Sequence, residues 1–328
     1  MKKIAIIGSG SWGSALGIYL SNNNNEVKVW SFSEEERDKI NNEKKCMFLP
    51  HATIPEGLMC SCNIEEVIEG ADIILHVTPS KFVRSTIKQY KDYVSPNQMI
   101  IMCSKGFEAE TLLTLDEVIK EEIPGCKYGI LSGPSHAEEV SINIPTALVV
   151  ASEDDDVKET VVDVFKSKTM RMYTSSDIKG VELGAALKNI IAFCAGVAVS
   201  LGLGDNSFAA LATRGLVEIS RLGVAMGGKE KTFYGLTGLG DLIVTCGSVH
   251  SRNRRAGELI GKGLSIEETK KKVGMTIESI DNIDVAYKLS QKYNIEMPIV
   301  NAVYNVLYNG LDPQKAVDGL MTRDLRAE

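Results

Sequence analysis

The sequence predicts an α/β fold in two domains: a doubly wound, Rossmann-like parallel-sheet domain over residues 1–180 and a mainly helical domain over residues 181–328. Apolar runs of strand length alternate with amphipathic helical patterns through the first half, which favours a parallel sheet covered on both faces. After about residue 179, long helical patterns follow one another without convincing strand pairs. At 328 residues the chain is long enough for about two domains, each with its own core.

The strands of the first domain are expected at a series of apolar segments. These are residues 3–8, 27–30, 72–77, 99–103, 129–132, 147–151 and 170–174. Amphipathic stretches at 81–93 and 111–122 separate some of them and are expected to be helices. This alternation is typical of a doubly wound sheet.

The second domain is expected to be built from helices at 181–203, 207–225, 254–261, 266–272, 279–293 and 299–309. Its longest uncharged stretch, 189–204, has 16 residues and contains several Gly and Ala. A membrane span needs roughly 20 apolar residues, so we expect a buried helix here and no membrane span.

Composition excludes several classes of function. The chain carries 36 basic and 43 acidic residues, a net charge of −7, so it lacks the basic field that nucleic-acid binding requires. Its seven cysteines are odd in number and scattered, which favours a reducing cytoplasm over a disulfide framework. Four separated histidines and the absence of paired C-x-x-C motifs argue against a metal site. The apolar run at 4–7 is too short for a signal peptide.

A glycine-rich turn follows the first predicted strand directly. Gly8, Gly10 and Gly13 form a G-x-G-x-x-G pattern at the start of a predicted helix. Gly8 would allow the tight turn, Gly10 the approach of a pyrophosphate, and Gly13 close packing of helix on strand. The phosphates would lie at the helix N-terminus, where Trp12 either packs in the fold or covers the cofactor. The pattern predicts a dinucleotide-binding site.

The end of the second predicted strand leaves the choice of dinucleotide open. An acidic residue there usually binds the ribose of NAD, and a basic one nearby accepts the 2′-phosphate of NADP. This chain has Trp30-Ser31-Phe32-Ser33-Glu34, which contains neither signal. Ser31 and Ser33 could bind a phosphate weakly, whereas the acidic residues 34–36 would repel one.

Lys188 lies within the most apolar predicted helix, with Asn189 beside it. Desolvation lowers the pKa of a lysine and makes it competent for proton transfer. The alternative is a structural lysine whose stem packs while its head reaches water.

Two later segments carry charge in unusual places. Gly235–Asp241 is a glycine-rich loop in which Asp241 either caps a turn or orients a catalytic lysine. Ser251 is the expected N-cap of a helix that begins with Arg252, Asn253 and two further arginines. Cations at a helix N-terminus are unfavourable, so either an anion binds there or these residues form a solvated basic face.

Two loops follow predicted parallel strands, where a doubly wound sheet binds its ligands. One contains Lys105, a candidate for an anionic substrate, and the other runs through Gly133, Ser135 and His136. A single histidine in a loop is more often structural than catalytic, so His136 is a weak candidate.

Together these segments resemble bacterial-type NAD(P)-dependent glycerol-3-phosphate dehydrogenase. The resemblance runs from residue 4 almost to residue 323, and no single common motif carries it. Its most specific segments are GSGSWGSALG at 8–17, FLPHATIPEGL at 48–58, SKGFE at 104–108, SGPSHAEEV at 132–140, ELGAALKNIIAFCAG at 182–196, GLTGLGDLIVTC at 235–246 and SRNRRAG at 251–257.

The resemblance implies reversible reduction of dihydroxyacetone phosphate to sn-glycerol 3-phosphate with NAD(P)H, a step that feeds glycerophospholipid synthesis, by a cytoplasmic homodimer. It assigns Lys188 as the proton donor to the substrate oxygen. The implied substrate-binding positions are Lys105, Gly133, Ser135, Lys188, Asp241, Ser251, Arg252 and Asn253. The implied cofactor contacts are Ser11, Trp12, Phe32, Lys105, Ala137, Arg252 and Glu278, in addition to the three glycines.

Two other functions share parts of this pattern. A β-hydroxyacid dehydrogenase-like oxidoreductase also pairs a dinucleotide fold with a helical domain, but the basic cluster at Arg252 argues against a substrate without phosphate. A nicotinamide-sensing regulator would need a partner surface or a DNA-binding element, and the sequence shows neither.

Overall fold

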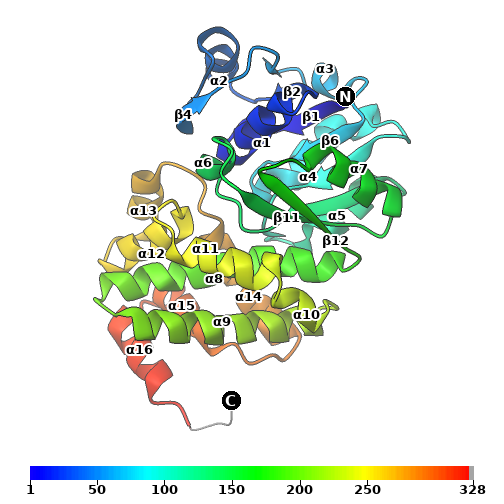
Figure 1. The fold of residues 1–328 in the computed structure, drawn as a ribbon. Coiled ribbons are helices and arrows are strands. Elements are labelled where there is room, and N and C mark those ends of the chain that lie inside the picture. Colours follow the sequence, from blue (N-terminus) through cyan, green and yellow to red (C-terminus); the bar gives the residue numbers. More distant parts are fainter. Residues whose placement is uncertain (325–328) are drawn as a thin grey trace. The chain divides into compact units, whose positions relative to one another are not determined.

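Strands and helices are interspersed along the chain as far as residue 175, and within the part of the chain that the structure describes only helices follow (Figure 1). This computed structural model describes residues 1–324. The chain divides into two units: the first contains Met1–Glu108 and Leu113–Glu182, and the second contains Ala109–Leu112 and the chain from Leu183.

An eight-stranded sheet forms the centre of the first unit, in the order β12-β11-β10-β7-β6-β1-β2-β5. The strands are β1 (Lys3–Ile7), β2 (Glu26–Trp30), β5 (Met59–Ser61), β6 (Ile73–His76), β7 (Met99–Met102), β10 (Lys127–Ser132), β11 (Thr146–Ala151) and β12 (Met170–Ser175). Neighbouring strands are parallel except β10 and β11. The parallel-dominated sheet confirms the predicted fold class.

Consecutive buried residues in the central strands show that both faces of the sheet are covered. Every residue of β6 is buried, as are Ile4 to Ile7 of β1, so side chains that point to opposite faces are both withdrawn from water. The α-helices of this unit are α1 (Ser11–Asn22), α2 (Glu34–Asp38), α3 (Ile64–Ile68), α4 (Val83–Tyr90), α5 (Leu115–Glu122), α6 (Ala137–Val140) and α7 (Asp155–Phe165).

The first unit differs from the sequence prediction in three places. β11 runs antiparallel to β10, and α6, the one helix described between them, has four residues and spans only about 6 Å, much less than the length of either six-residue strand. The edge strand β5 was not predicted, since three residues show no periodicity. Two small hairpins were also missed: β3 (Lys45–Cys46) with β4 (Leu49–Thr53), and β8 (Phe107–Glu108) with β9 (Leu113–Thr114).

The second unit is helical, as the sequence predicts. Its elements are α8 (Ile178–Ser200, which begins in the first unit), α9 (Asp205–Ala225), α10 (Glu230–Phe233), a π-helical turn (Leu236–Gly240), α11 (Asp241–Gly247), α12 (Arg252–Gly261), α13 (Ile266–Val273), α14 (Glu278–Lys292), α15 (Pro298–Tyr308) and α16 (Pro313–Met321). Among the described residues only α8 is long and apolar enough to cross a membrane, and 78% of its most apolar window is buried inside the protein. That burial is typical of a core helix.

Two glycines allow α8 and α12 to cross at very short distance. A Cβ added to Gly196 would lie 1.9 Å from the backbone oxygen of Arg254, and one added to Gly257 would lie 1.9 Å from that of Phe193. Any side chain at either position would therefore push the helices apart. This crossing brings the basic start of α12 alongside the helix that carries Lys188.

Candidate active site

The glycine turn between β1 and α1 is built by backbone interactions. Gly8 has φ +124°, and its N–H donates to the carbonyl of Trp30, 3.1 Å away at the end of β2. A Cβ on Gly13 would lie 1.9 Å from the oxygen of Gly8, so α1 starts directly against the turn. These contacts hold the N-terminus of α1 at the carboxyl ends of two parallel strands, where such sheets bind ligands.

The start of α1 fits the pyrophosphate of a dinucleotide. Gly10 is its N-cap and provides no side-chain hydrogen bond, so the N–H groups of the first turn have no acceptor from the cap. A Cβ on Gly10 would meet nothing within 4 Å, which leaves open space above the turn. The indole Nε1 of Trp12 is buried and has no hydrogen-bond partner within the protein. Unfilled N–H donors beside open space are what an anion requires.

Two further loops of the first unit contribute candidate residues. Nζ of Lys105 donates to the carbonyl of Gly133 at 3.2 Å, and the hydroxyl of Ser135 donates to the same oxygen at 3.0 Å. His136 is the N-cap of α6, Ala137 is its first residue, and α6 packs against α1. The structure therefore groups Lys105, Gly133 and Ser135, while Phe32 after β2 is 81% exposed.

The second unit contains a buried cluster around Lys188. This residue is only 5% exposed, and its Nζ donates to Oδ1 of Asp241 and to Oγ1 of Thr245, each at 2.6 Å. The hydroxyl of Thr245 donates in turn to Oδ1 of Asp241 at 3.1 Å. Of the two sequence interpretations, the one in which the lysine head simply reaches water is wrong, because the ammonium group is held by two buried acceptors.

A helical turn positions Asp241, and here the sequence interpretation needs correction. The segment before Asp241 was expected to be a loop, but Leu236–Gly240 forms a π-helical turn that continues into α11. A Cβ on Gly238 would lie 2.0 Å from the oxygen of Phe233, and one on Gly184 would lie 3.0 Å from that of Thr237. The glycines thus let this turn pack tightly against both α8 and α10. Single π-helical turns occur often at functional sites.

The start of α12 is tied to α8 and α14 through one amide. Ser251 is the N-cap, as predicted, and its hydroxyl accepts from the backbone N–H of Arg254 at 3.2 Å. Nδ2 of Asn253 donates to Oδ1 of Asn189 at 2.9 Å, and Oδ1 of Asn253 accepts from the N–H of Ser279 at 3.0 Å. Both polar atoms of the Asn253 amide therefore join helices. Glu278 is the first residue of α14, next to this junction.

Comparison with known proteins identifies the family. Residues 3–158 match the family described as NAD-dependent glycerol-3-phosphate dehydrogenase N-terminus, and residues 177–318 match the corresponding C-terminus. The chain belongs to the NAD-dependent glycerol-3-phosphate dehydrogenase family. The resemblance inferred from the sequence is confirmed.

Relatives within this glycerol-3-phosphate dehydrogenase family match along the whole chain. Glycerol-3-phosphate dehydrogenase [NAD(P)+] of Fusobacterium nucleatum is 46% identical, with 100% of this chain and 99% of the relative covered. The Clostridium perfringens protein of the same name is 47% identical with the same coverage. The crystal structure of glycerol-3-phosphate dehydrogenase from Coxiella burnetii has a TM-score of 0.94 at 38% identity, covering 98% of this chain and 99% of that one.

Sequence reasoning missed Thr245 and underused Asn189. Thr245 lies four residues after Asp241 on α11, so the two side chains share a helix face, and this spacing was a usable signal. Asn189 was noticed only as a neighbour of Lys188, although it meets Asn253 across the α8–α12 crossing. No sequence pattern pairs residues that far apart.

Other polar groups of the protein have structural roles. His76 is fully buried, and its ring contacts the hydroxyls of Tyr90 and Thr78 at 3.0 and 2.7 Å. Burial lowers the pKa of His76 to about 3, so it stays neutral and is unsuited to acid–base catalysis near pH 7. Within residues 1–324, no group of three or more His, Cys, Asp or Glu could hold a metal ion.

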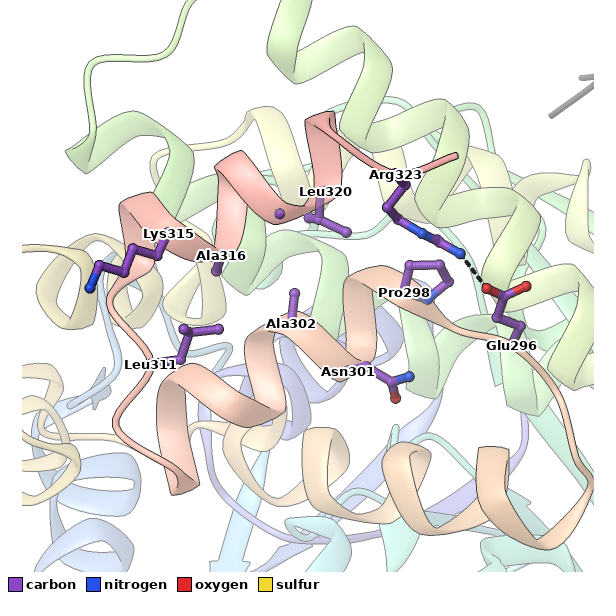
Figure 2. Close-up of a pocket in the computed structure, with 10 residues that line it drawn as sticks. Glu296, Pro298, Asn301, Ala302, Leu311, Lys315, Ala316, Leu320 and Arg323 are labelled. Carbon is purple, nitrogen blue, oxygen red and sulfur yellow. Dashed lines mark hydrogen bonds and ion pairs between the residues drawn. The ribbon is translucent and has the colours of Figure 1, made fainter. Parts of the chain in front are cut away.

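A groove lies between α15 and α16, and its lining contains no predicted site residue. Figure 2 shows Arg323 reaching Glu296 across one end, with Pro298 and Ala302 on α15 below Leu320 on α16. None of the candidate substrate or cofactor residues lines it. We therefore do not assign it to the reaction.

Proposed function

We propose that this protein catalyses the reversible NAD(P)H-dependent reduction of dihydroxyacetone phosphate to sn-glycerol 3-phosphate, which feeds glycerophospholipid synthesis. The observation that carries the assignment of residues is the buried contact of Lys188 with Asp241 and Thr245, both at 2.6 Å. Membership of the family supports the reaction.

Lys188 acts as the proton donor in this proposal. Reduction of the C2 carbonyl develops negative charge on its oxygen, and a positioned ammonium group stabilises that charge and then neutralises it. Asp241 stabilises the ammonium electrostatically, and Thr245 fixes its direction through a second acceptor. In the oxidative direction the neutral amine of Lys188 would take the proton back from the C2 hydroxyl.

The remaining candidates bind and orient. Arg252, at the start of α12, would hold the substrate phosphate, because guanidinium and helix N–H groups both favour phosphate oxygens. Bound NAD(P)H supplies the hydride. Residues proposed to contact the cofactor are Gly8, Gly10, Ser11, Trp12, Gly13, Phe32, Lys105, Ala137, Arg252 and Glu278. Residues proposed to contact the substrate are Lys105, Gly133, Ser135, Lys188, Asp241, Ser251, Arg252 and Asn253.

Asn253 has a different part from the one expected. Because its amide already joins α8 to α14, we propose that it positions the N-terminus of α12 in addition to any contact with substrate. Roles for the two domains follow: residues 1–180 bind the dinucleotide and residues 181–328 bind the substrate. The resemblance further suggests a cytoplasmic homodimer, and sedimentation of the purified protein would test the dimer.

The deciding experiment follows NADH and NADPH oxidation by absorbance, with and without dihydroxyacetone phosphate. Consumption that requires the phosphorylated ketone supports the reaction. Turnover of a hydroxyacid without phosphate, in place of sn-glycerol 3-phosphate, would instead favour a β-hydroxyacid dehydrogenase. Binding of both cofactors without consumption of either would overturn the substrate assignment.

Arg252→Ala tests the phosphate grip. Loss of a charge-assisted, partly buried contact should raise KM for dihydroxyacetone phosphate by roughly 30-fold or more. Arg255→Ala is the matched control, since Arg255 is an exposed arginine of the same helix turn. Equal KM values for the two variants would remove Arg252 from the phosphate site.

A further inference from the structure

The end of β2, which shows no acidic residue in the sequence, receives a carboxylate from α2. Oγ of Ser31, the residue after β2, donates to Oε2 of Glu36 at 2.9 Å. Oγ of Ser9, inside the glycine turn, contacts the same carboxylate oxygen and lies 2.8 Å from Oγ of Ser31. All three residues are buried, with Glu36 only 9% exposed. The carboxylate thus sits between the phosphate-binding turn and the end of β2.

This location is where a doubly wound sheet distinguishes its two dinucleotides. An acidic group at the end of the second strand binds the adenosine ribose hydroxyls of NAD, and the same group repels the 2′-phosphate of NADP. The N–H of Gly8 bonds to Trp30 at 3.1 Å, so the turn and the strand end are directly adjacent. Both hydroxyl contacts of Glu36 use Oε2, which leaves Oε1 to accept from a ribose hydroxyl.

The hydroxyl and basic groups that could bind a 2′-phosphate already have partners within the protein. The hydroxyl of Ser31 donates to Glu36, and that of Ser33 caps α2 by accepting from the N–H of Glu36. Of the basic residues, Arg37 pairs with Asp38 at 2.9 Å and Lys39 with Glu35 at 2.7 Å. Helix α2 carries four acidic residues and one basic residue, so its field opposes a phosphate.

We propose that Glu36, held by Ser9 and Ser31, determines cofactor specificity by favouring a free ribose 2′-hydroxyl, so that the protein uses NADH in preference to NADPH. The inference rests on the proposed function only in requiring that a dinucleotide binds at the glycine turn. It makes Glu36 a specificity residue on α2 in place of the acidic residue usually found at the strand end.

Direct binding of fragments tests the proposal without turnover. By calorimetry, the protein should bind ADP-ribose roughly 20-fold or more tightly than 2′-phospho-ADP-ribose, because like charges held close together are strongly disfavoured. Glu36→Gln removes the charge but keeps the shape, and should narrow this ratio to roughly 3-fold or less. The ratio of kcat/KM for NADH over NADPH should change in parallel.

Glu35→Gln is the matched control, because it removes one exposed carboxylate from the same helix and should leave the ratio within about twofold. A merely structural role for Glu36 would weaken both fragments equally in Glu36→Gln and leave the ratio unchanged. Thermal melting shows whether Glu36→Gln is folded. If it is not, Ser31→Ala serves instead, because it loosens the same carboxylate and should also narrow the ratio of the affinities for ADP-ribose and 2′-phospho-ADP-ribose.

The outcomes separate this inference from the proposed function. Equal or tighter binding of 2′-phospho-ADP-ribose by the unmodified protein, for example through Arg37 released from Asp38, would overturn the inference while leaving the dehydrogenase assignment intact. Failure to bind either fragment would overturn the dinucleotide site itself.

Discussion

The glycine turn of the first unit and the lysine cluster of the second are built from different materials. The turn uses the backbone of consecutive residues from Gly8 to Gly13, and the groups proposed to bind the cofactor there are N–H donors. The cluster uses side chains that lie far apart in sequence: Lys188 and Asp241 are 53 positions apart, and Asn189 and Asn253 are 64. One site depends on local conformation, and the other depends on how helices cross.

This difference predicts how each site fails. In the turn, a substitution should disrupt the structure chiefly at Gly8 and Gly13, because the geometry at these two positions requires glycine. In the cluster, a change of one partner leaves another charged group buried without compensation. The dependence of the second unit on buried partners and on helix packing can be broken, in order of decreasing effect, at Lys188, Gly257, Thr245 and Glu218.

Lys188→Met should abolish most turnover and leave cofactor binding by the turn in place. General acid–base groups contribute 10²–10⁴-fold, so we expect kcat to fall roughly 1,000-fold while NADH titration gives a similar Kd. The variant also leaves the carboxylate of Asp241 buried without its ammonium partner, which lowers the free energy of unfolding. Adding Asp241→Asn should recover the melting temperature without recovering turnover. Near-normal turnover of Lys188→Met would refute the catalytic assignment.

Gly257→Ala tests how much the close crossing of α8 and α12 contributes to the stability of the second unit. Its Cβ would lie 1.9 Å from the oxygen of Phe193, so the helices must separate, and we expect a loss of about 3 kcal/mol in the free energy of unfolding. The control is Gly319→Ala on exposed α16, where a Cβ meets nothing within 4 Å. That change should stabilise by up to about 1 kcal/mol, since alanine is the better helix former. Denaturant unfolding measures both.

The contrast also explains what the sequence could predict. The G-x-G-x-x-G turn was predicted to the residue because a local conformation and its sequence signature occupy the same positions. Lys188 was singled out because a charge inside an apolar helix is conspicuous, and Arg252 because cations at a helix start conflict with the dipole. The catalytic role of Lys188 and the phosphate-binding role of Arg252 stay predictions.

What could not be predicted depends on long-range packing. The contact of Asn189 with Asn253 follows from the crossing at Gly196 and Gly257, and a glycine in a helix does not reveal which backbone it approaches. Glu36 was noted only as one of three acidic residues, because nothing local shows that its carboxylate reaches Ser9. The antiparallel β11 was missed for a similar reason, since the length of α6 was not visible in the sequence pattern.

Thr245→Val should produce a smaller, purely catalytic defect. Valine has nearly the same shape but removes the hydroxyl that accepts from Lys188 and donates to Asp241. We expect kcat to fall about 10-fold, equivalent to about 1.4 kcal/mol, with KM for dihydroxyacetone phosphate little changed. Thr245→Ser keeps the hydroxyl and should restore most activity, an outcome that a packing role for the methyl group would not give.

A second helix N-terminus sharpens the comparison with α1. The first turn of α15 is satisfied within the protein: Glu218, 4% exposed, accepts from the N–H groups of Ile299 and Val300 at 2.7 and 3.2 Å. Burial raises the pKa of Glu218 to about 7, although these two N–H groups, with Arg323 and Arg221, act to lower it. The N-cap of α1 supplies no side-chain acceptor, whereas the first turn of α15 is held by a buried carboxylate.

The raised pKa makes the stability of this helix junction depend on pH. Between about pH 4.5 and pH 7 the folded protein holds a proton on Glu218 that the unfolded chain releases, so this group's contribution to stability falls as pH rises through 7. Relative to Glu218→Gln, the unmodified protein should lose on the order of 1 kcal/mol, or roughly 2 °C in melting temperature, between pH 6 and pH 8. Glu230→Gln is the control at an exposed position on α10, and its melting temperature relative to the unmodified protein should be the same at pH 6 and pH 8. The difference in melting temperature between the unmodified protein and Glu218→Gln could instead stay constant from pH 6 to pH 8. That result would mean that Glu218 keeps one protonation state throughout, and that the two N–H donors of α15 outweigh the burial of its carboxylate.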